Sequence, residues 1–358
     1  MTKVQINTGF SYSVLIEKGL FQKIGPLLKN EIKGKALVLT DERVGNLYAD
    51  LILKQLKESE IQGDIYRVKE GEDSKSLCVY GEILEYMAAN NYHRNDTLIS
   101  LGGGVIGDLG GFVAATFQRG MEYIQMPTSL LAAVDSSVGG KTALNLREGK
   151  NLVGAFKQPL AVYCDPEVFK SMERERFADG VAESIKYGIL FDRDLFNLFK
   201  SPLTKEDERL EELVEKAVKH KAEVVARDEF EKDERKLLNL GHTIGHSIER
   251  ASGFKITHGH AVAIGMAVMA KACSKRQILK ETERDEILEV LKKNDLPTDT
   301  SFSVEVLFEH IYKDKKSDGK NITIVEIEEI GKCRLKKIPL LSFKEYIEEG
   351  IDDCRDCS

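Results

Sequence analysis

The chain of 358 residues has no tryptophan, seven prolines, only six cysteines and no long apolar run. Cysteines scattered through a long chain exclude a disulfide-dense scaffold and favour reduced thiols. Cys354 and Cys357 have C-x-x-C spacing near the acidic C-terminal end. Without a second pair or a βαβ context, that spacing is more typical of ordinary thiols than of a redox or zinc motif.

The sequence also lacks the features of a membrane or secreted protein. No stretch approaches the roughly 20 apolar residues of a spanning helix, and the N-terminus has no signal-peptide pattern. An excess of positive charge is missing too, because 52 basic and 59 acidic side chains give a formal net charge of −7. We therefore expect a cytoplasmic protein with no membrane or nucleic-acid partner, in which any anion-binding cluster is local.

The first half of the chain alternates short β-branched runs with amphipathic segments. Strands are predicted at residues 36–40, 64–68, 97–101 and 121–126, and helices at 46–58 and 76–90. This alternation is typical of βαβ units around a mostly parallel sheet. The pattern predicts an α/β protein whose residues 1–173 form an N-terminal Rossmann-like domain.

The second half is dominated by long segments with helical periodicity. Such segments cover residues 176–200, 205–227, 235–251, 260–276 and 281–293, and an apolar run at 322–327 indicates a returning strand or hairpin. We therefore expect residues 174–358 to form a mainly α-helical domain.

A glycine-rich turn follows the strand predicted at 97–101. The segment Gly-Gly-Gly-Val-Ile-Gly-Asp (102–108) lets backbone approach a pyrophosphate closely and opens a helix whose N–H groups favour phosphate. The spacing is not G-x-G-x-x-G, so a tight turn with close helix packing remains the alternative. Asp41, at another predicted strand end, fits either a ribose ligand or a helix N-cap.

Four of the seven histidines, His242, His246, His258 and His260, fall within nineteen residues. His242 and His246 are four residues apart and share a helix face, and imidazole is a common ligand of divalent metals. A catalytic zinc takes three protein ligands, so a carboxylate is sought to accompany two histidines. Glu183 lies in an apolar helical segment where an unpaired charge would be costly, and Lys186 follows on the same face.

Lysines gather around a second glycine-containing segment. Lys141, Lys150 and Lys157 lie near Gly-Lys-Thr (140–142), but a phosphate loop requires glycine at position 135, which is Asp135. A nucleoside triphosphatase is therefore rejected. Lysines are usually solvated, yet beside glycine turns and clustered histidines they suit a doubly anionic small substrate.

Between residues 41 and 316 these motifs together resemble the 3-dehydroquinate synthases, a family of sugar phosphate cyclases. The most specific stretches are 102–108, 134–142, 149–151, 180–188 and 239–246. The resemblance implies an enzyme of the shikimate pathway of chorismate and aromatic amino-acid biosynthesis. Its family converts 3-deoxy-D-arabino-heptulosonate 7-phosphate to 3-dehydroquinate and phosphate. NAD takes a hydride transiently, phosphate leaves, the hydride returns, and an intramolecular aldol step closes the ring.

The same resemblance implies roles for individual residues. A zinc or cobalt ion is expected on Glu183, His242 and His258, while His246 reaches the substrate. NAD is expected to contact Asp41, Glu70, Gly71, Glu72, Asp73, Ser74, Lys75, Gly104, Val105, Ile106, Gly107, Asp108, Thr128, Ser129, Lys141 and Lys150. The substrate is expected to contact Asp135, Lys141, Asn151, Lys186, Lys221, Glu231, Arg235, Asn239, His246 and either Lys315 or Lys316. Arg119 is expected to enter the site of a partner subunit, which implies a homodimer.

Three other classes remain open at this stage. A metal-dependent polyol or alcohol dehydrogenase shares the glycine loop and the histidines but needs no cluster of anion-binding residues. A cyclase that acts on a neutral sugar phosphate would not need Lys221 and Arg235 for a carboxylate. A non-catalytic metal- or nucleotide-binding protein would show no turnover at all.

Overall fold

The computed structural model describes residues 1–315 and 321–351, with only the backbone for residues 314 and 315. It divides into two compact units. The first comprises Met1–Met172 and Leu210–Phe230, and the second comprises Glu173–Arg209 and the described residues from Glu231 onward. Among the described cysteines, Cys78, Cys164, Cys273 and Cys333 are thiols and not disulfides.

The first unit is built on a seven-stranded sheet of order β1-β2-β9-β6-β5-β3-β4. Only β1 and β2 pair antiparallel within this sheet, and every other pairing is parallel. The strands are β1 (Thr2–Ile6), β2 (Tyr12–Ile16), β3 (Ala36–Asp41), β4 (Gly63–Val68), β5 (Thr97–Gly102), β6 (Glu122–Pro127) and β9 (Ala161–Cys164). The mostly parallel α/β fold predicted from the alternating pattern is confirmed.

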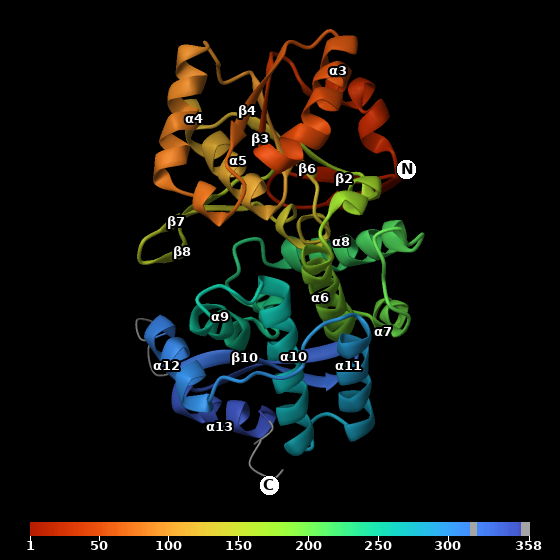
Figure 1. Ribbon diagram of the computed structural model, residues 1–358, viewed down its shortest axis with the longest axis vertical. Helices are drawn as coiled ribbons and strands as arrows, with labels where there is room; N and C mark the ends of the chain where they lie inside the picture. Colours follow the sequence, from red (N-terminus) through yellow and green to blue (C-terminus); the bar gives the residue numbers. More distant parts are fainter. Residues whose placement is uncertain (316–320, 352–358) are drawn as a thin grey trace. The chain divides into compact units, whose positions relative to one another are not determined.

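Helices cover both faces of this sheet. In Figure 1, α4 (Leu77–Ala89) and α5 (Gly104–Thr116) lie on one side and α3 (Asp50–Glu58) on the other, as right-handed crossovers between parallel strands require. A continuous core forms between the sheet and the first pair, with Leu39, Leu98, Ile83 and Val113 all buried. The carboxyl ends of β3, β4, β5 and β6 therefore share one edge of the sheet.

A long helix from the second half of the sequence belongs to this first unit. Helix α8 (Leu210–Arg227) packs on β1 and on the π-helix η5 (Ala132–Ser136). Its apolar stripe, which includes Leu213 and Val218, is buried, and Glu211 accepts a hydrogen bond from the backbone N–H of Lys18 at 2.5 Å. The structure thus differs from a single division at residue 174, because the chain returns to the sheet before it completes the second unit.

Two antiparallel strands, β7 (Lys141–Leu146) and β8 (Gly149–Phe156), form a separate hairpin in the first unit. The sequence analysis did not predict them, nor β1, β2 and β9. Much of β8 is exposed, so it has no apolar alternation for a pattern to detect.

The second unit is mainly helical. Its principal elements are α6 (Arg174–Phe191), α7 (Arg193–Asn197), α9 (His242–Ala251), α10 (His258–Lys275), α11 (Glu281–Lys293), α12 (Val304–Lys315), α13 (Leu340–Gly350) and the hairpin β10 (Asn321–Glu329) with β11 (Lys332–Pro339). The predicted helix 176–200 ends early because Asp192 caps a new helix, accepting bonds from the backbone N–H groups of Asp194 and Leu195. In the described residues no helix combines the length and apolarity needed to cross a bilayer.

Candidate active site

Glu183 lies in the middle of α6 with only 1% of its side chain exposed. One carboxylate oxygen, Oε2, accepts a hydrogen bond from Lys186, three residues further along the helix and equally buried. The charge that sequence reasoning treated as costly therefore has an internal counter-charge. The prediction that Lys186 lies on the same face as Glu183 is confirmed by this contact.

Two histidines meet the other oxygen of Glu183. His242 is the first residue of α9 and His258 the first residue of α10. Their Nε2 atoms lie 3.4 and 3.5 Å from Glu183 Oε1. The three ligand atoms all lie within 4.8 Å of one another, so residues separated by up to 75 positions form one cluster of a carboxylate and two imidazoles.

The hydrogen bonds of the two rings define which nitrogen faces the cluster. Nδ1 of His242 lies 3.1 Å from the carbonyl oxygen of Leu240, which can only accept, so Nδ1 carries the proton and Nε2 keeps its lone pair. Nδ1 of His258 lies 3.2 Å from a carboxylate oxygen of Glu249. A carboxylate or carbonyl on the far nitrogen is the usual arrangement behind a metal-bound histidine.

The same surroundings move the two histidine pKa values in opposite directions. Burial, together with the ammonium group of Lys186, lowers the pKa of His242 to about 3, so this ring is neutral. Burial also opposes the charge of His258, but the carboxylates of Glu183 and Glu249 outweigh it and raise the pKa of His258 to about 10. A cation at Nε2 would displace that proton, as metal ligands generally require.

Glycines bring the three helices close enough for this cluster. A Cβ on Gly259 would lie 2.2 Å from the Cα of Asp179, so the start of α10 can rest on α6 only with glycine there. Gly241 has φ of 78° and a Cβ on it would lie 2.6 Å from the carbonyl oxygen of Val262. This left-handed residue breaks the helix predicted over 235–251 and starts α9 at His242.

Asp179 also fixes the first turn of α10. Its Oδ1 accepts a hydrogen bond from the hydroxyl of Thr257 at 2.6 Å and lies 3.1 Å from Nδ1 of His260. His260 therefore faces Asp179 and lies outside both groups of ligand atoms found in the described residues. The position of His258 thus depends on the contacts that its two neighbours in sequence, Thr257 and Gly259, make with Asp179.

The residues present fit a divalent metal of the zinc type. Zinc and cobalt accept mixed carboxylate and imidazole donors, and a catalytic site keeps three protein ligands. Glu183, His242 and His258 supply that set with outer hydrogen bonds already formed.

His246 and Glu249, also on α9, form a second group with His258 whose ligand atoms lie within 4.8 Å. Sequence reasoning missed Glu249, which is buried. Its spacing could have revealed it, because positions 242, 246 and 249 share one helix face.

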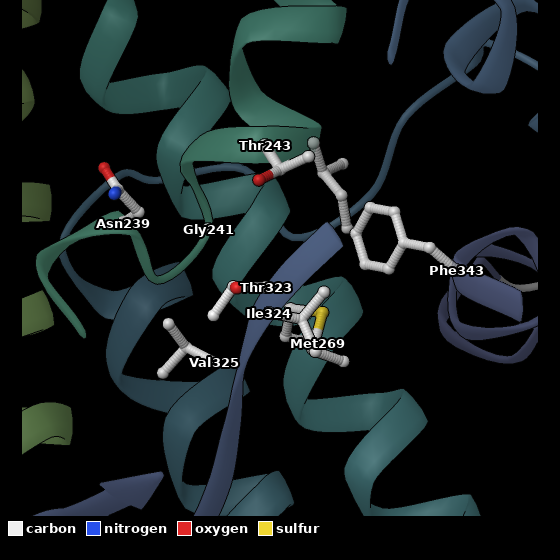
Figure 2. Close-up of a pocket in the computed structure, with 9 residues that line it drawn as sticks. Asn239, Gly241, Thr243, Met269, Thr323, Ile324, Val325 and Phe343 are labelled. Atoms are coloured by element: carbon white, nitrogen blue, oxygen red, sulfur yellow. The ribbon is translucent and has the colours of Figure 1, made fainter. Parts of the chain in front are cut away.

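A small pocket is lined in part by the turn that precedes α9. Figure 2 shows Asn239 and Gly241 at this turn, with Thr243, Met269, Ile324 and Phe343 among the lining residues. Among the described residues that line it, none belongs to the Glu183 cluster. The pocket is therefore distinct from the cluster, although Asn239 and Gly241, which line the pocket, lie directly before His242 of the cluster in the sequence.

Most residues expected to bind NAD gather at the carboxyl edge of the sheet. Asp41 ends β3, the glycine turn follows β5, and Thr128 follows β6. Asp41 acts as an N-cap, accepting a 2.8 Å bond from the N–H of Val44, and burial raises its pKa. Helix α5 begins at Gly104, directly after the strand, so its first N–H groups open toward this edge.

The loop after β4 contacts that helix. Lys75, which is 4% exposed, donates a hydrogen bond to Asp108 and another to Asn151 Oδ1 at 2.5 Å. Burial raises the pKa of Asp108, although the Lys75 ammonium opposes this shift. These contacts join two expected NAD segments and one expected substrate residue. Glu70, Gly71, Glu72 and Asp73 are exposed, and Ser74 is buried.

The remaining predicted residues occupy several places. Lys221 of α8, 4% exposed, donates to the carbonyl oxygen and Oδ1 of Asp135 at 2.6 and 2.7 Å. In the second unit, Asn239 donates to Glu231 Oε1 at 3.1 Å, and Arg235 is 2% exposed. Others that are exposed or partly exposed are Val105, Ser129, Lys141, Lys150, Asn151 and His246, whereas Ile106 and Gly107 are buried. The Lys315 side chain, Lys316, Cys354 and Cys357 lie outside the described residues.

Arg119 is exposed on a strained segment. It has φ of 66°, and the preceding Gln118 has φ of 47°. Gln118 is held by hydrogen bonds with the backbone N–H of Arg94 at 3.0 Å and the carbonyl of Tyr92 at 3.3 Å. Left-handed non-glycine residues cost about 1–3 kcal/mol each and persist where surrounding contacts fix them.

The fold is similar to those of solved sugar phosphate cyclases. 2-Deoxy-scyllo-inosose synthase complexed with carbaglucose-6-phosphate, NAD⁺ and Co²⁺ has a TM-score of 0.87 and 25% identity, over 98% of this chain and 100% of that chain. 2-Epi-5-epi-valiolone synthase from Streptomyces hygroscopicus, with NAD⁺ and Zn²⁺ bound, has a TM-score of 0.87 and 23% identity over 97% of both chains. An iron-containing alcohol dehydrogenase is less similar, with a TM-score of 0.64 and 17% identity over 95% of this chain and 97% of that chain. The fold is therefore that of the sugar phosphate cyclases.

Sequence comparison places the chain within this class. The family models for the 3-dehydroquinate synthase N-terminal and C-terminal regions match residues 65–179 and 180–317. A 3-dehydroquinate synthase of Streptococcus thermophilus is 38% identical over 94% of this chain and 97% of its own length. That of Clostridium kluyveri is 41% identical over 92% and 93%. The chain belongs to the 3-dehydroquinate synthase family.

Proposed function

We propose that this protein converts 3-deoxy-D-arabino-heptulosonate 7-phosphate to 3-dehydroquinate and phosphate, as a step of the shikimate pathway. The observation that carries the proposal is the cluster of buried Glu183 with the partly exposed His242 and His258, which lies within a chain matched by both family models. When bound, NAD supplies a transient hydride acceptor and the metal a Lewis acid that polarises the reacting hydroxyl. Glu183, His242 and His258 would hold the metal.

We assign the nucleotide to the carboxyl edge of the first unit's sheet. Support comes from the helix that starts at Gly104 and from Asp41, whose half-buried carboxylate can take ribose hydroxyls. The segment from Glu70 to Lys75, the segment from Gly104 to Asp108, Thr128, Ser129, Lys141 and Lys150 complete this assignment.

The substrate's two anionic groups require separate positive residues. Lys221 and Arg235 are assigned to the carboxylate, because a desolvated ammonium or guanidinium gives the strongest attraction and both side chains are buried. Lys141, Asn151, His246 and either Lys315 or Lys316 are assigned to the phosphate. Lys186 would keep Glu183 oriented through their hydrogen bond, while Asp135, Glu231 and Asn239 orient the carboxylate-binding side chains and the substrate hydroxyls.

We also infer a homodimer in which Arg119 enters the partner's site, and a cytoplasmic location. Support for the first inference comes from the exposed, strained Arg119 segment. Equilibrium sedimentation tests the dimer, and a mixed dimer of Arg119→Ala with a site-dead variant tests the exchange. One restored site per mixed dimer is expected, and no restoration would exclude the exchange.

The reaction is expected to need NAD only in trace amounts. Because the hydride returns within each cycle, one NAD should support many turnovers without lasting absorbance from NADH. The measurement is phosphate release and absorbance at the NADH band, with and without NAD and with a chelator. NADH that accumulates in step with product would establish a dehydrogenase and reject the proposal.

A cyclase acting on a neutral sugar phosphate is the second candidate. It is favoured by the likeness to a synthase solved with carbaglucose-6-phosphate. Buried Lys221 and Arg235 would then have no carboxylate to bind. Turnover of a hexose phosphate, with none of the seven-carbon acid, would favour this candidate.

Glu249 is expected to strengthen metal binding through its contact with His258. Glu249→Gln keeps the size of the side chain but removes the charge that orients His258 Nδ1, so metal affinity is expected to fall about 10–100-fold. Competition with a chromophoric chelator measures this directly. Glu309→Gln, which alters an exposed carboxylate on α12, is the matched control. Equal affinity in the two variants would contradict the role of Glu249.

A further inference from the structure

Asn145 interrupts the pairing of the β7–β8 hairpin. Leu144 pairs with Val153 and Leu146 with Gly149, and the register shifts between them, leaving Asn145 at a bulge. Asn145 instead bridges to Ser76, and its N–H donates to the carbonyl of Lys75 at 2.8 Å. The bulge therefore turns the backbone N–H of this residue away from β8 and toward the segment after β4.

The side chain of Asn145 contacts both the segment after β4 and strand β8. Its Nδ2 donates to Glu72 Oε1 at 2.7 Å, and its Oδ1 accepts from the N–H of Asn151 at 3.0 Å. A second route joins the same segments, because Lys75 donates to Asn151 Oδ1. An amide is suited to this position, since one carboxamide provides the donor that Glu72 needs and the acceptor that Asn151 needs.

Asn151 needs such support because its φ is 59°. The left-handed region is unfavourable for a residue with a Cβ unless local contacts hold it, although asparagine tolerates it better than most residues. The Asn145 and Lys75 bonds fix its backbone N–H and its side-chain oxygen respectively. The direction of the Asn151 side chain therefore depends on the conformation of residues 72–75.

We propose that Asn145 is a positioning residue that couples nucleotide binding at the Glu72–Lys75 segment to substrate binding at Asn151. A nucleotide that orders Glu72 and Lys75 would also order Asn151 through the Asn145 carboxamide. The substrate would then bind to an Asn151 side chain that is already in its binding conformation. The coupling is reciprocal, because each ligand changes the affinity of the other by the same factor. This inference rests on the proposed function, which assigns the two segments to NAD and substrate.

The test measures the affinity of the full-length protein for a non-reacting carbocyclic phosphonate analogue of the substrate by calorimetry, with and without saturating NAD. NAD is expected to tighten binding by about tenfold in the wild type, on the scale of one hydrogen bond to a charged group. In Asn145→Ala this factor should fall to about one, while exchange of the Asn151 amide proton becomes faster. Asn90→Ala removes an exposed asparagine at the end of α4 and should leave the factor unchanged.

An unchanged factor in Asn145→Ala, or a factor of one in the wild type, would overturn the inference. Asn145→Ser, which keeps a hydroxyl acceptor but cannot reach Glu72 as a donor, replaces the alanine variant if thermal unfolding shows that alanine does not fold. Phosphate release by the wild type is measured in the same preparations. Its absence would reject the proposed function, whereas a retained factor with normal release would reject only the coupling.

Discussion

Glu183→Gln is expected to release the tightly bound metal and to slow phosphate release by about 1,000-fold or more, equivalent to about 4 kcal/mol of activation free energy. The amide retains the shape of the carboxylate but loses the charge that faces the Nε2 atoms of His242 and His258 at 3.4 and 3.5 Å. Metal content after dialysis and the rate of phosphate release measure the two effects separately. A variant that keeps one metal per chain would reject the assignment of Glu183.

A second variant guards against a trivial loss of folding. Glu183→Gln leaves Lys186 buried beside a neutral amide, and breaking a buried pair commonly costs about 3–5 kcal/mol. His242→Ala leaves that pair intact and removes the imidazole ring, whose loss leaves no unpaired charge, so it should lose metal with a smaller loss of stability. His310→Ala, on α12, is the matched control and should keep both metal and activity.

Arg235→Ala is expected to reduce the preference for a carboxylate-bearing inhibitor by roughly 30-fold or more, because losing one partner of a desolvated charge pair costs about 2–5 kcal/mol. The Arg235 side chain is 2% exposed in a chain of net charge −7, so its charge is neither solvated nor part of a general basic surface. The measurement compares binding of a carbocyclic phosphonate with binding of its analogue that lacks the carboxylate.

The ratio of the two affinities isolates the carboxylate from general damage to the site. Exposed Arg250 on α9 provides the matched control, and Arg250→Ala should leave the ratio unchanged. Arg235→Lys keeps the charge but loses the forked geometry, so an intermediate ratio is expected. If wild type and Arg235→Ala share the same ratio, the carboxylate assignment is wrong and the neutral-sugar reaction gains support.

The sequence by itself determined the elements whose side chains are buried in a regular pattern. Strands β3, β5 and β6 and helices α10 and α11 were predicted within a few residues, because burial on a sheet or a helix face favours apolar runs and periods that a pattern can detect. The mostly exposed β8 carries no such period, and the helix break at Gly241 depends on contact with Val262 and Met266.

The histidine cluster and Glu183 are visible in the chain as residue types, but the choice of His258 over His246 as the third ligand came from the family resemblance and not from spacing. Only the tertiary structure decided that Lys186 pairs with Glu183, that Glu249 supports His258, and that α8 returns to the first unit. The physical reason is the same in each case. Hydrogen bonds and helix packing join residues that are far apart in sequence, or join one of several partners that the sequence leaves equivalent. Which partners pair is fixed only when the backbone places donor and acceptor within about 3 Å of each other.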